Sequence, residues 1–155
     1  MKDALLEVRD LKKHYPVTGG LFRRTVGTVR AVDGISFDVE EGSTFGLAGE
    51  SGCGKSTAAR TILRLEEPTS GSIRFNGEDF SAKGPEELRL ARTDMQMIFQ
   101  DPYSSLNPRH TVAKIISEPL RVHNIGTHAE QKERVRHLLD VVGLPADAAE
   151  RYPYE

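Results

Sequence analysis

The stretch Gly49-Glu-Ser-Gly-Cys-Gly-Lys-Ser-Thr57 decides the fold of this chain, because it satisfies the pattern G-x-x-x-x-G-K-[ST] in full. Its glycines leave room for backbone N–H groups to surround a phosphate, and they permit positive φ angles. Lys55 supplies a positive charge for the β- and γ-phosphates of a nucleotide, and Ser56 supplies a hydroxyl for Mg²⁺. The sequence therefore predicts a phosphate-binding loop for a nucleoside triphosphate.

The residues on either side of this loop agree with the prediction. Residues 43–48 form a short apolar run suited to a buried strand, and residues 55–65 suit a helix. The motif requires a strand, a glycine loop and a helix in this order, because the helix then presents its N-terminus to the anion. The predicted binding residues are Gly49, Glu50, Ser51, Gly52, Cys53, Gly54, Lys55, Ser56 and Thr57.

Composition restricts the class of protein. The 155 residues suit one compact domain, and a net charge of −2 gives no bulk electrostatic reason to bind nucleic acid. Met1-Lys2-Asp3 is not followed by the apolar segment of a secretory signal, and no apolar stretch approaches the ~20 residues that cross a bilayer. Cys53 is the single cysteine, which fits a reducing cytoplasm, and we interpret it as a small residue without a catalytic role.

The rest of the chain reads as a mixture of strands and helices. Strands are expected at 5–11, at 29–39 with a turn or bulge at Asp33-Gly34, at 72–75 and at 95–99, and a surface excursion is expected at 16–28. Helices are expected at 85–92, from Thr111 to His123 with an interruption near Pro119, and from about Ala129 to a stop at Gly143.

The sequence Leu138-Leu139-Asp140 superficially resembles the strand that carries a Mg²⁺-binding carboxylate in many nucleotide-hydrolysing enzymes. The apolar residues around it recur with the period of a helix through Val142, which argues against a strand. We therefore expect a nucleotide cradle here without a hydrolytic carboxylate.

Four stretches together make the sequence similar to a known family. They are Leu11–Pro16 with Gly20–Phe22 and Arg30–Phe37, the phosphate loop itself, Glu67–Ile73, and Met97–Arg109. In these stretches the chain resembles the ATP-binding subunit of an ABC transporter, and Met97–Arg109 is the most specific for the oligopeptide/dipeptide importer branch.

The resemblance implies an α/β fold with an incomplete P-loop NTPase core of the ABC ATPase type. Residues 1–42 would form an N-terminal antiparallel β subdomain, 43–100 the P-loop core as far as the Q-loop, and 101–155 a truncated helical subdomain. Tyr15 matches the aromatic residue that stacks on adenine. Gln100 matches the catalytic Q-loop glutamine, which reaches Mg²⁺ and the attacking water and couples the site to the transmembrane subunits.

The same resemblance implies ATP and Mg²⁺ as cofactors, with Ser56 and Gln100 as the metal-binding residues. It implies ATP binding and, in the full-length parent, ATP hydrolysis that energises import of peptides or related solutes. The expected partners are transmembrane permease subunits, a second ATP-binding subunit (the same or a sister chain) and, indirectly, an extracytoplasmic solute-binding protein, with no nucleic acid. The expected location is peripheral, on the cytoplasmic face of the inner membrane.

The matched pattern reaches Glu155, directly before the place of the family's signature loop. A full subunit would be roughly twice this length. The resemblance therefore predicts that the chain alone does not hydrolyse ATP at a useful rate, and that the strand at 43–48 lacks its usual parallel neighbours. Two other readings stay open: a non-transport ABC-type ATPase and a non-hydrolysing nucleotide-binding fragment. A small P-loop kinase fits less well, because 48 residues precede the loop.

Overall fold

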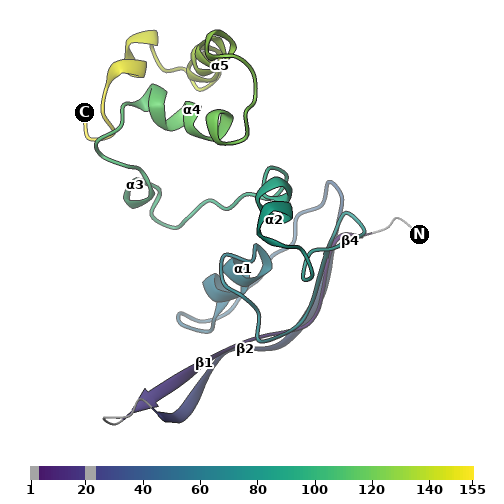
Figure 1. The fold of residues 1–155 in the computed structure, drawn as a ribbon. Coiled ribbons are helices and arrows are strands. Elements are labelled where there is room, and N and C mark those ends of the chain that lie inside the picture. The colour runs from purple at the N-terminus through teal and green to yellow at the C-terminus, as the bar shows by residue number, and fades with distance from the viewer. Residues whose placement is uncertain (1–3, 20–23) are drawn as a thin grey trace. The chain divides into compact units, whose positions relative to one another are not determined.

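The computed structural model describes residues 4–19 and 24–155, and the chain divides into two compact units, Met1–Gln96 and Met97–Glu155. Figure 1 shows the strands and helices of each unit. Gly20–Phe22 and Arg23, which belong to the predicted surface excursion at 16–28, lie outside the described residues. The predicted segments 1–42, 43–100 and 101–155 remain predictions.

An antiparallel sheet forms the frame of the first unit. Its strands are β1 (Ala4–Gly19), β2 (Arg24–Glu40), β3 (Ser70–Phe75) and β4 (Glu78–Asp79), in the spatial order β2-β1-β3-β4. β1 pairs antiparallel with both β2 and β3, and β3 pairs antiparallel with β4. The predicted antiparallel β subdomain is confirmed, and it also takes in the two later strands.

The β1–β2 hairpin is longer than predicted. Pro16 pairs with Thr28 and Val17 with Gly27, so the described part of the expected excursion continues both strands instead of leaving the sheet. The predicted bulge is present, because the pairing steps from Leu11↔Ile35 to Lys12↔Asp33. Gly34 is skipped and has a φ of 87°, a conformation that favours glycine.

Two helices pack against the apolar cluster of this sheet. The cluster consists of fully or nearly fully buried side chains from the strands, from the segment after β4 and from α2: Val8, Leu11, Ile73, Phe80 and Leu88. Ile62, from α1 (Lys55–Ile62), and Ala91, from α2 (Pro85–Ala91), pack against it. The helix that follows the phosphate loop is therefore fixed on the sheet by its C-terminal turn.

The two strands predicted at 43–48 and 95–99 are not formed. Neither segment has a strand partner among the described residues, and Leu47 and Ile98 are exposed. The Phe45 ring is stacked on Phe37 of β2 at 4.5 Å between ring centroids, so the first segment still contacts the sheet. Both predictions were wrong because an apolar run becomes a strand only where another strand supplies its hydrogen-bond partners.

The helix predicted at 55–65 ends earlier, at Ile62. Arg64 adopts a left-handed conformation with a φ of 48°, which turns the chain away from the helix axis. The N–H of Leu65 donates to the Arg60 carbonyl at 2.9 Å, which closes the last turn. The chain then leads through Glu66 and Glu67 toward β3.

The second unit is helical. It contains α3 (Pro102–Ser105), α4 (Val112–Val122), α5 (His128–Val141) and the short 3₁₀ helix η1 (Ala146–Glu150). α4 is continuous through Pro119, contrary to the predicted interruption, and Thr111 caps its N-terminus by accepting from the Lys114 N–H. α4 lies against both α5 and η1. The buried apolar side chains of this unit come from α5 and η1, and they are Val135, Leu139 and Ala148.

The α5 prediction is confirmed, with a narrower buried face than the sequence pattern suggested. Val135 and Leu139 are buried, whereas Val142 is exposed. Asp140 lies within this helix, as the periodicity predicted, and not at the end of a strand. No helix among the described residues combines the length and apolar character that crossing a membrane requires.

Candidate phosphate-binding site

The phosphate loop connects the unpaired segment 43–48 to the N-terminus of α1. Gly52 and Gly54 have φ angles of 80° and 95°, the left-handed conformation that the sequence predicted for this loop, whereas Gly49 does not have a positive φ. Gly49 is instead constrained by space, since a Cβ at this position would lie 2.6 Å from the Cys53 sulfur. Glycine therefore has two separate functions in the loop.

Gly54 is the point at which the loop rests on the sheet. A Cβ at this position would lie 2.0 Å from the carbonyl oxygen of Ala31 in β2. No side chain fits that approach, so only glycine brings the loop so near the strand. The loop is thus supported by β2, although the segment that leads into it has no strand partner among the described residues.

Lys55 lies across its own loop. Its ammonium donates to the carbonyl oxygens of Gly49 and Glu50, each at 2.6 Å, and lies 3.4 Å from the Cys53 sulfur. The positive charge is therefore held at the centre of the loop, where the predicted phosphates would lie.

The N-terminus of α1 is arranged to attract an anion. The first turn carries no acidic residue, so the partial positive charge of the helix end is not neutralised by the helix itself. Ser56 is exposed and Thr57 is partly buried. Both hydroxyls thus belong to the turn that follows Lys55, as the sequence predicted.

Tyr15 lies on β1 beside the start of α1. Its hydroxyl donates to the Glu66 carboxylate, and this hydrogen bond is the largest cause that raises the pKa of Tyr15 above its ordinary value. Burial and the negative charge of Glu66 raise the same pKa further. Thr57 and Arg60, both on α1, act on the same pKa in the opposite direction. The ammonium of Lys13 lies over the Tyr15 ring, 4.9 Å from its centroid.

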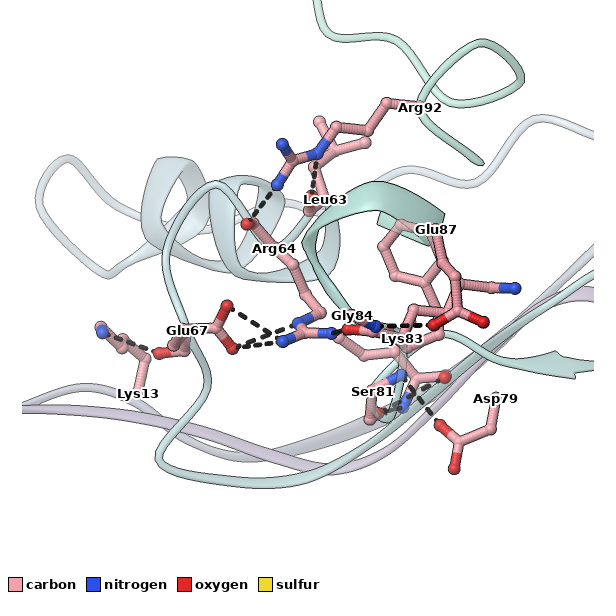
Figure 2. Close-up of polar contacts among 12 residues, drawn as sticks. Lys13, Leu63, Arg64, Glu67, Asp79, Ser81, Lys83, Gly84, Glu87 and Arg92 are labelled. Atoms are coloured by element: carbon pink, nitrogen blue, oxygen red, sulfur yellow. Dashed lines mark hydrogen bonds and ion pairs between the residues drawn. The ribbon is translucent and has the colours of Figure 1, made fainter. Parts of the chain in front are cut away.

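The segment after α1 is held by a network of arginine hydrogen bonds (Figure 2). The Arg64 guanidinium binds both carboxylate oxygens of Glu67 and donates to the carbonyls of Phe80 and Lys83, the latter at 2.7 Å. Arg92 in turn donates to the Arg64 carbonyl at 2.6 Å. The turn that ends α1 is therefore fastened to the segment between β4 and α2 and to the residue that follows α2.

Gln100 belongs to the second unit, where it is exposed one residue before Asp101, the N-cap of α3. The phosphate loop and Tyr15 belong to the first unit. The structure thus brings Tyr15 and the loop onto one unit, while the predicted role of Gln100 remains a prediction.

Sequence reasoning missed the contacts of Tyr15 with Glu66 and Lys13. It also missed the hydrogen bond from Lys13 to the Glu67 carbonyl and the ion pair between Glu67 and Arg64. Tyr15 and Glu66 are 51 positions apart, and no local pattern links a tyrosine on a strand to an acidic pair after a helix. These contacts depend on the packing of α1 against the sheet, which a single sequence does not specify.

A comparison with protein-family models matches residues 32–155 to the model described as "ABC transporter". This match spans most of the chain. The chain belongs to the ABC transporter family.

Curated proteins similar to this chain include ATP-binding proteins of the oligopeptide/dipeptide branch of the ABC transporter family. The chain is 52% identical over 155 residues to the oligopeptide transport ATP-binding protein AppF of Bacillus subtilis, covering 99% of this chain and 47% of AppF. It is 42% identical over 152 residues to the di/tripeptide transport ATP-binding protein DppF of Pseudomonas aeruginosa, covering 98% of this chain and 47% of DppF. The ABC family chain thus spans about half the length of these relatives.

A solved structure confirms the fold. The dimeric structure of MJ0796, described as a bacterial ABC transporter cassette, matches with a TM-score of 0.79 at 23% identity, over 96% of this chain and 62% of MJ0796. At this identity the likeness concerns the fold alone: the chain has the ABC cassette fold, in part.

Proposed function

We propose that this ABC family chain binds ATP together with Mg²⁺ through Gly49–Thr57. The observation that carries the proposal is the geometry of the loop, in which Gly52 and Gly54 have positive φ angles and Lys55 lies across the loop at the start of α1. Backbone N–H groups, a helix N-terminus and one lysine are the groups that recognise the phosphates of a nucleotide.

The Mg²⁺ ion would be held by few protein groups. The Ser56 hydroxyl is exposed at the N-terminus of α1 and is an oxygen donor of the kind that Mg²⁺ prefers. Mg²⁺ completes its shell with water and phosphate oxygens, so one hydroxyl from this unit fits the metal. Bound Mg²⁺ would neutralise part of the phosphate charge. Gln100 is the second proposed metal-binding residue, on the grounds of its match to the family's Q-loop glutamine.

The wider function that we infer is that of the ATP-binding part of an oligopeptide or dipeptide importer. It is supported by the similarity of the chain, at 52% and 42% identity, to the oligopeptide transport ATP-binding protein AppF and the di/tripeptide transport ATP-binding protein DppF. Its direct partners would be transmembrane permease subunits and a second ATP-binding subunit, and an extracytoplasmic solute-binding protein would be an indirect partner. It would be located on the cytoplasmic face of the membrane. ATP hydrolysis and transport belong to the complete protein in this proposal.

Calorimetric titration of the purified protein with MgATP tests the binding proposal. Lys55→Ala removes the charge that faces the phosphates and is expected to weaken binding at least about tenfold, the range of a lost charge-assisted hydrogen bond. Lys83→Ala is the matched control, because Lys83 forms a surface ion pair with Glu78 away from the loop. Equal affinities of the wild type and Lys55→Ala would contradict the proposal.

A further inference from the structure

We propose that Glu66 is a positioning residue that holds the Tyr15 ring for the base of a bound nucleotide, and that Lys13, held by Glu67, reserves one face of that ring. The inference rests on the proposed ATP binding and on the proposed stacking of adenine on Tyr15. It goes further by naming the residues that set the orientation of the stacking platform and the face that the base uses.

The first step is the hydroxyl of Tyr15. A tyrosine on a strand can turn about its side-chain bonds, and a base stacks well only on a ring of fixed orientation. The Tyr15 hydroxyl donates to the Glu66 carboxylate, and that carboxylate is paired with Arg60 of α1 at 3.7 Å. Glu66 is mostly buried, with a side chain 26% exposed. The ring is thereby tied to the same helix that carries Lys55 and Thr57.

The second step is the face of the ring. The Lys13 ammonium lies 4.9 Å from the centroid of the Tyr15 ring and donates to the Glu67 carbonyl at 2.7 Å. The Glu67 carboxylate is bound through two oxygens by Arg64, whose side chain is only 11% exposed (Figure 2). The cation therefore has a fixed place over one ring face. A base must use the opposite face.

The two steps give consecutive residues complementary roles. Glu66 holds the edge of the ring through its side chain, and Glu67 holds Lys13 through its backbone. The turn at Arg64, with its φ of 48°, brings this acidic pair back toward β1. The distance between the stacking platform and the phosphate loop is then set by α1 and by this turn, which gives the nucleotide two fixed anchor points.

The test compares two ligands, MgATP and magnesium tripolyphosphate, because only ATP carries a base. Glu66→Ala and Tyr15→Phe each remove the hydroxyl–carboxylate hydrogen bond and are expected to weaken MgATP binding about five- to tenfold. Tripolyphosphate affinity should be unchanged in both variants. The double variant should bind no more weakly than either single variant, because both lose the same interaction.

Three further variants sharpen the result. Glu66→Gln keeps an oxygen that accepts from Tyr15 and should retain most of the affinity. Glu86→Ala is the matched control, since Glu86 is an exposed glutamate paired with Arg89 on α2, and it should leave both affinities unchanged. Lys13→Ala removes the cation that contacts the Tyr15 ring, so the ring is held less firmly, and it should weaken MgATP binding about two- to fivefold without affecting tripolyphosphate.

The outcomes separate this inference from the proposed function. Unchanged MgATP affinity in Glu66→Ala, or an equal loss for both ligands, overturns the positioning role while ATP binding stands. A wild type that binds neither ligand overturns the proposed function. Absorbance titration of tyrosinate, with Tyr15→Phe to assign the signal, gives a readout without nucleotide. Glu66→Gln should lower the pKa of Tyr15, and an unchanged pKa contradicts the coupling on its own.

Discussion

The chain contains apolar segments of two kinds. Those in the sheet of the first unit form paired strands, whereas the segments at 43–48 and 95–99 have similar apolar sequences and do not form strands. In the sheet, Val8, Leu11 and Ile73 lie on paired strands and are fully buried. In the two segments, Leu47 and Ile98 have no strand partner among the described residues and are exposed. The difference shows that apolar character alone is not enough to form a strand in this chain. A strand also needs a neighbouring strand whose backbone supplies its hydrogen-bond partners.

The largest expected effect comes from removing the same side chain from each region. Ile73→Ala leaves a cavity beneath the sheet and is expected to lower the free energy of unfolding by about 2–5 kcal/mol. Ile98 is 91% exposed, so Ile98→Ala is expected to change it by less than about 0.5 kcal/mol. Urea unfolding followed by circular dichroism measures both. Similar losses in the two variants would break the comparison.

The second effect asks whether the phosphate loop depends on the sheet. Gly54→Ala places a Cβ against the Ala31 carbonyl in a left-handed conformation, and we expect a loss of about 2–3 kcal/mol in unfolding free energy. Gly52→Ala has the same conformational strain with nothing within 4 Å, so a loss of about 1 kcal/mol is expected. Thermal unfolding of both variants separates steric support from strain. Equal losses would show that β2 does not support the loop.

The third effect compares a helix, whose terminal backbone groups are satisfied by nearby residues, with the strands, which depend on distant partners. Helix α5 satisfies its first N–H groups locally, because Thr127 accepts from the Glu130 N–H and Glu130 accepts from the Thr127 N–H. Thr127→Ala should lower the unfolding free energy by about 1 kcal/mol. Thr25→Ala, on the exposed surface of β2, is the control and should have a smaller effect in the same denaturant titration. No loss in Thr127→Ala would mean that α5 does not rely on its cap.

The smallest effect is a pH dependence of the same cap. Hydrogen bonds from the backbone and then the side chain of Thr127 hold the pKa of Glu130 below its ordinary value of 4.5. This contribution to stability is present above pH 4.5 and is lost as the pH falls through the lower pKa of the folded state. The midpoint difference between wild type and Glu130→Gln should therefore shrink between neutral and acidic pH. A constant difference would contradict the titration of this group.

The predictable parts of the molecule were those encoded by neighbouring residues. The loop pattern, the Thr111 cap, the bulge at Gly34 and the periodicity of α5 are local, and the structure has all four. The failures at 43–48 and 95–99, and the unforeseen Tyr15–Glu66 contact, depend on segments far apart in sequence. The helical run through Pro119 shows the reverse case, in which a local rule was too strict.

The carbonyl contacts of Lys55 have a kinetic consequence. Its ammonium is already shared by two backbone oxygens at 2.6 Å, so an incoming anion displaces partners and does not simply add one. Capture would then proceed as an encounter followed by a switch of the lysine from carbonyl to phosphate oxygen. In stopped-flow experiments the observed rate constant of binding would level off at high nucleotide concentration. Its plateau would equal the rate at which the Lys55 side chain leaves its own loop.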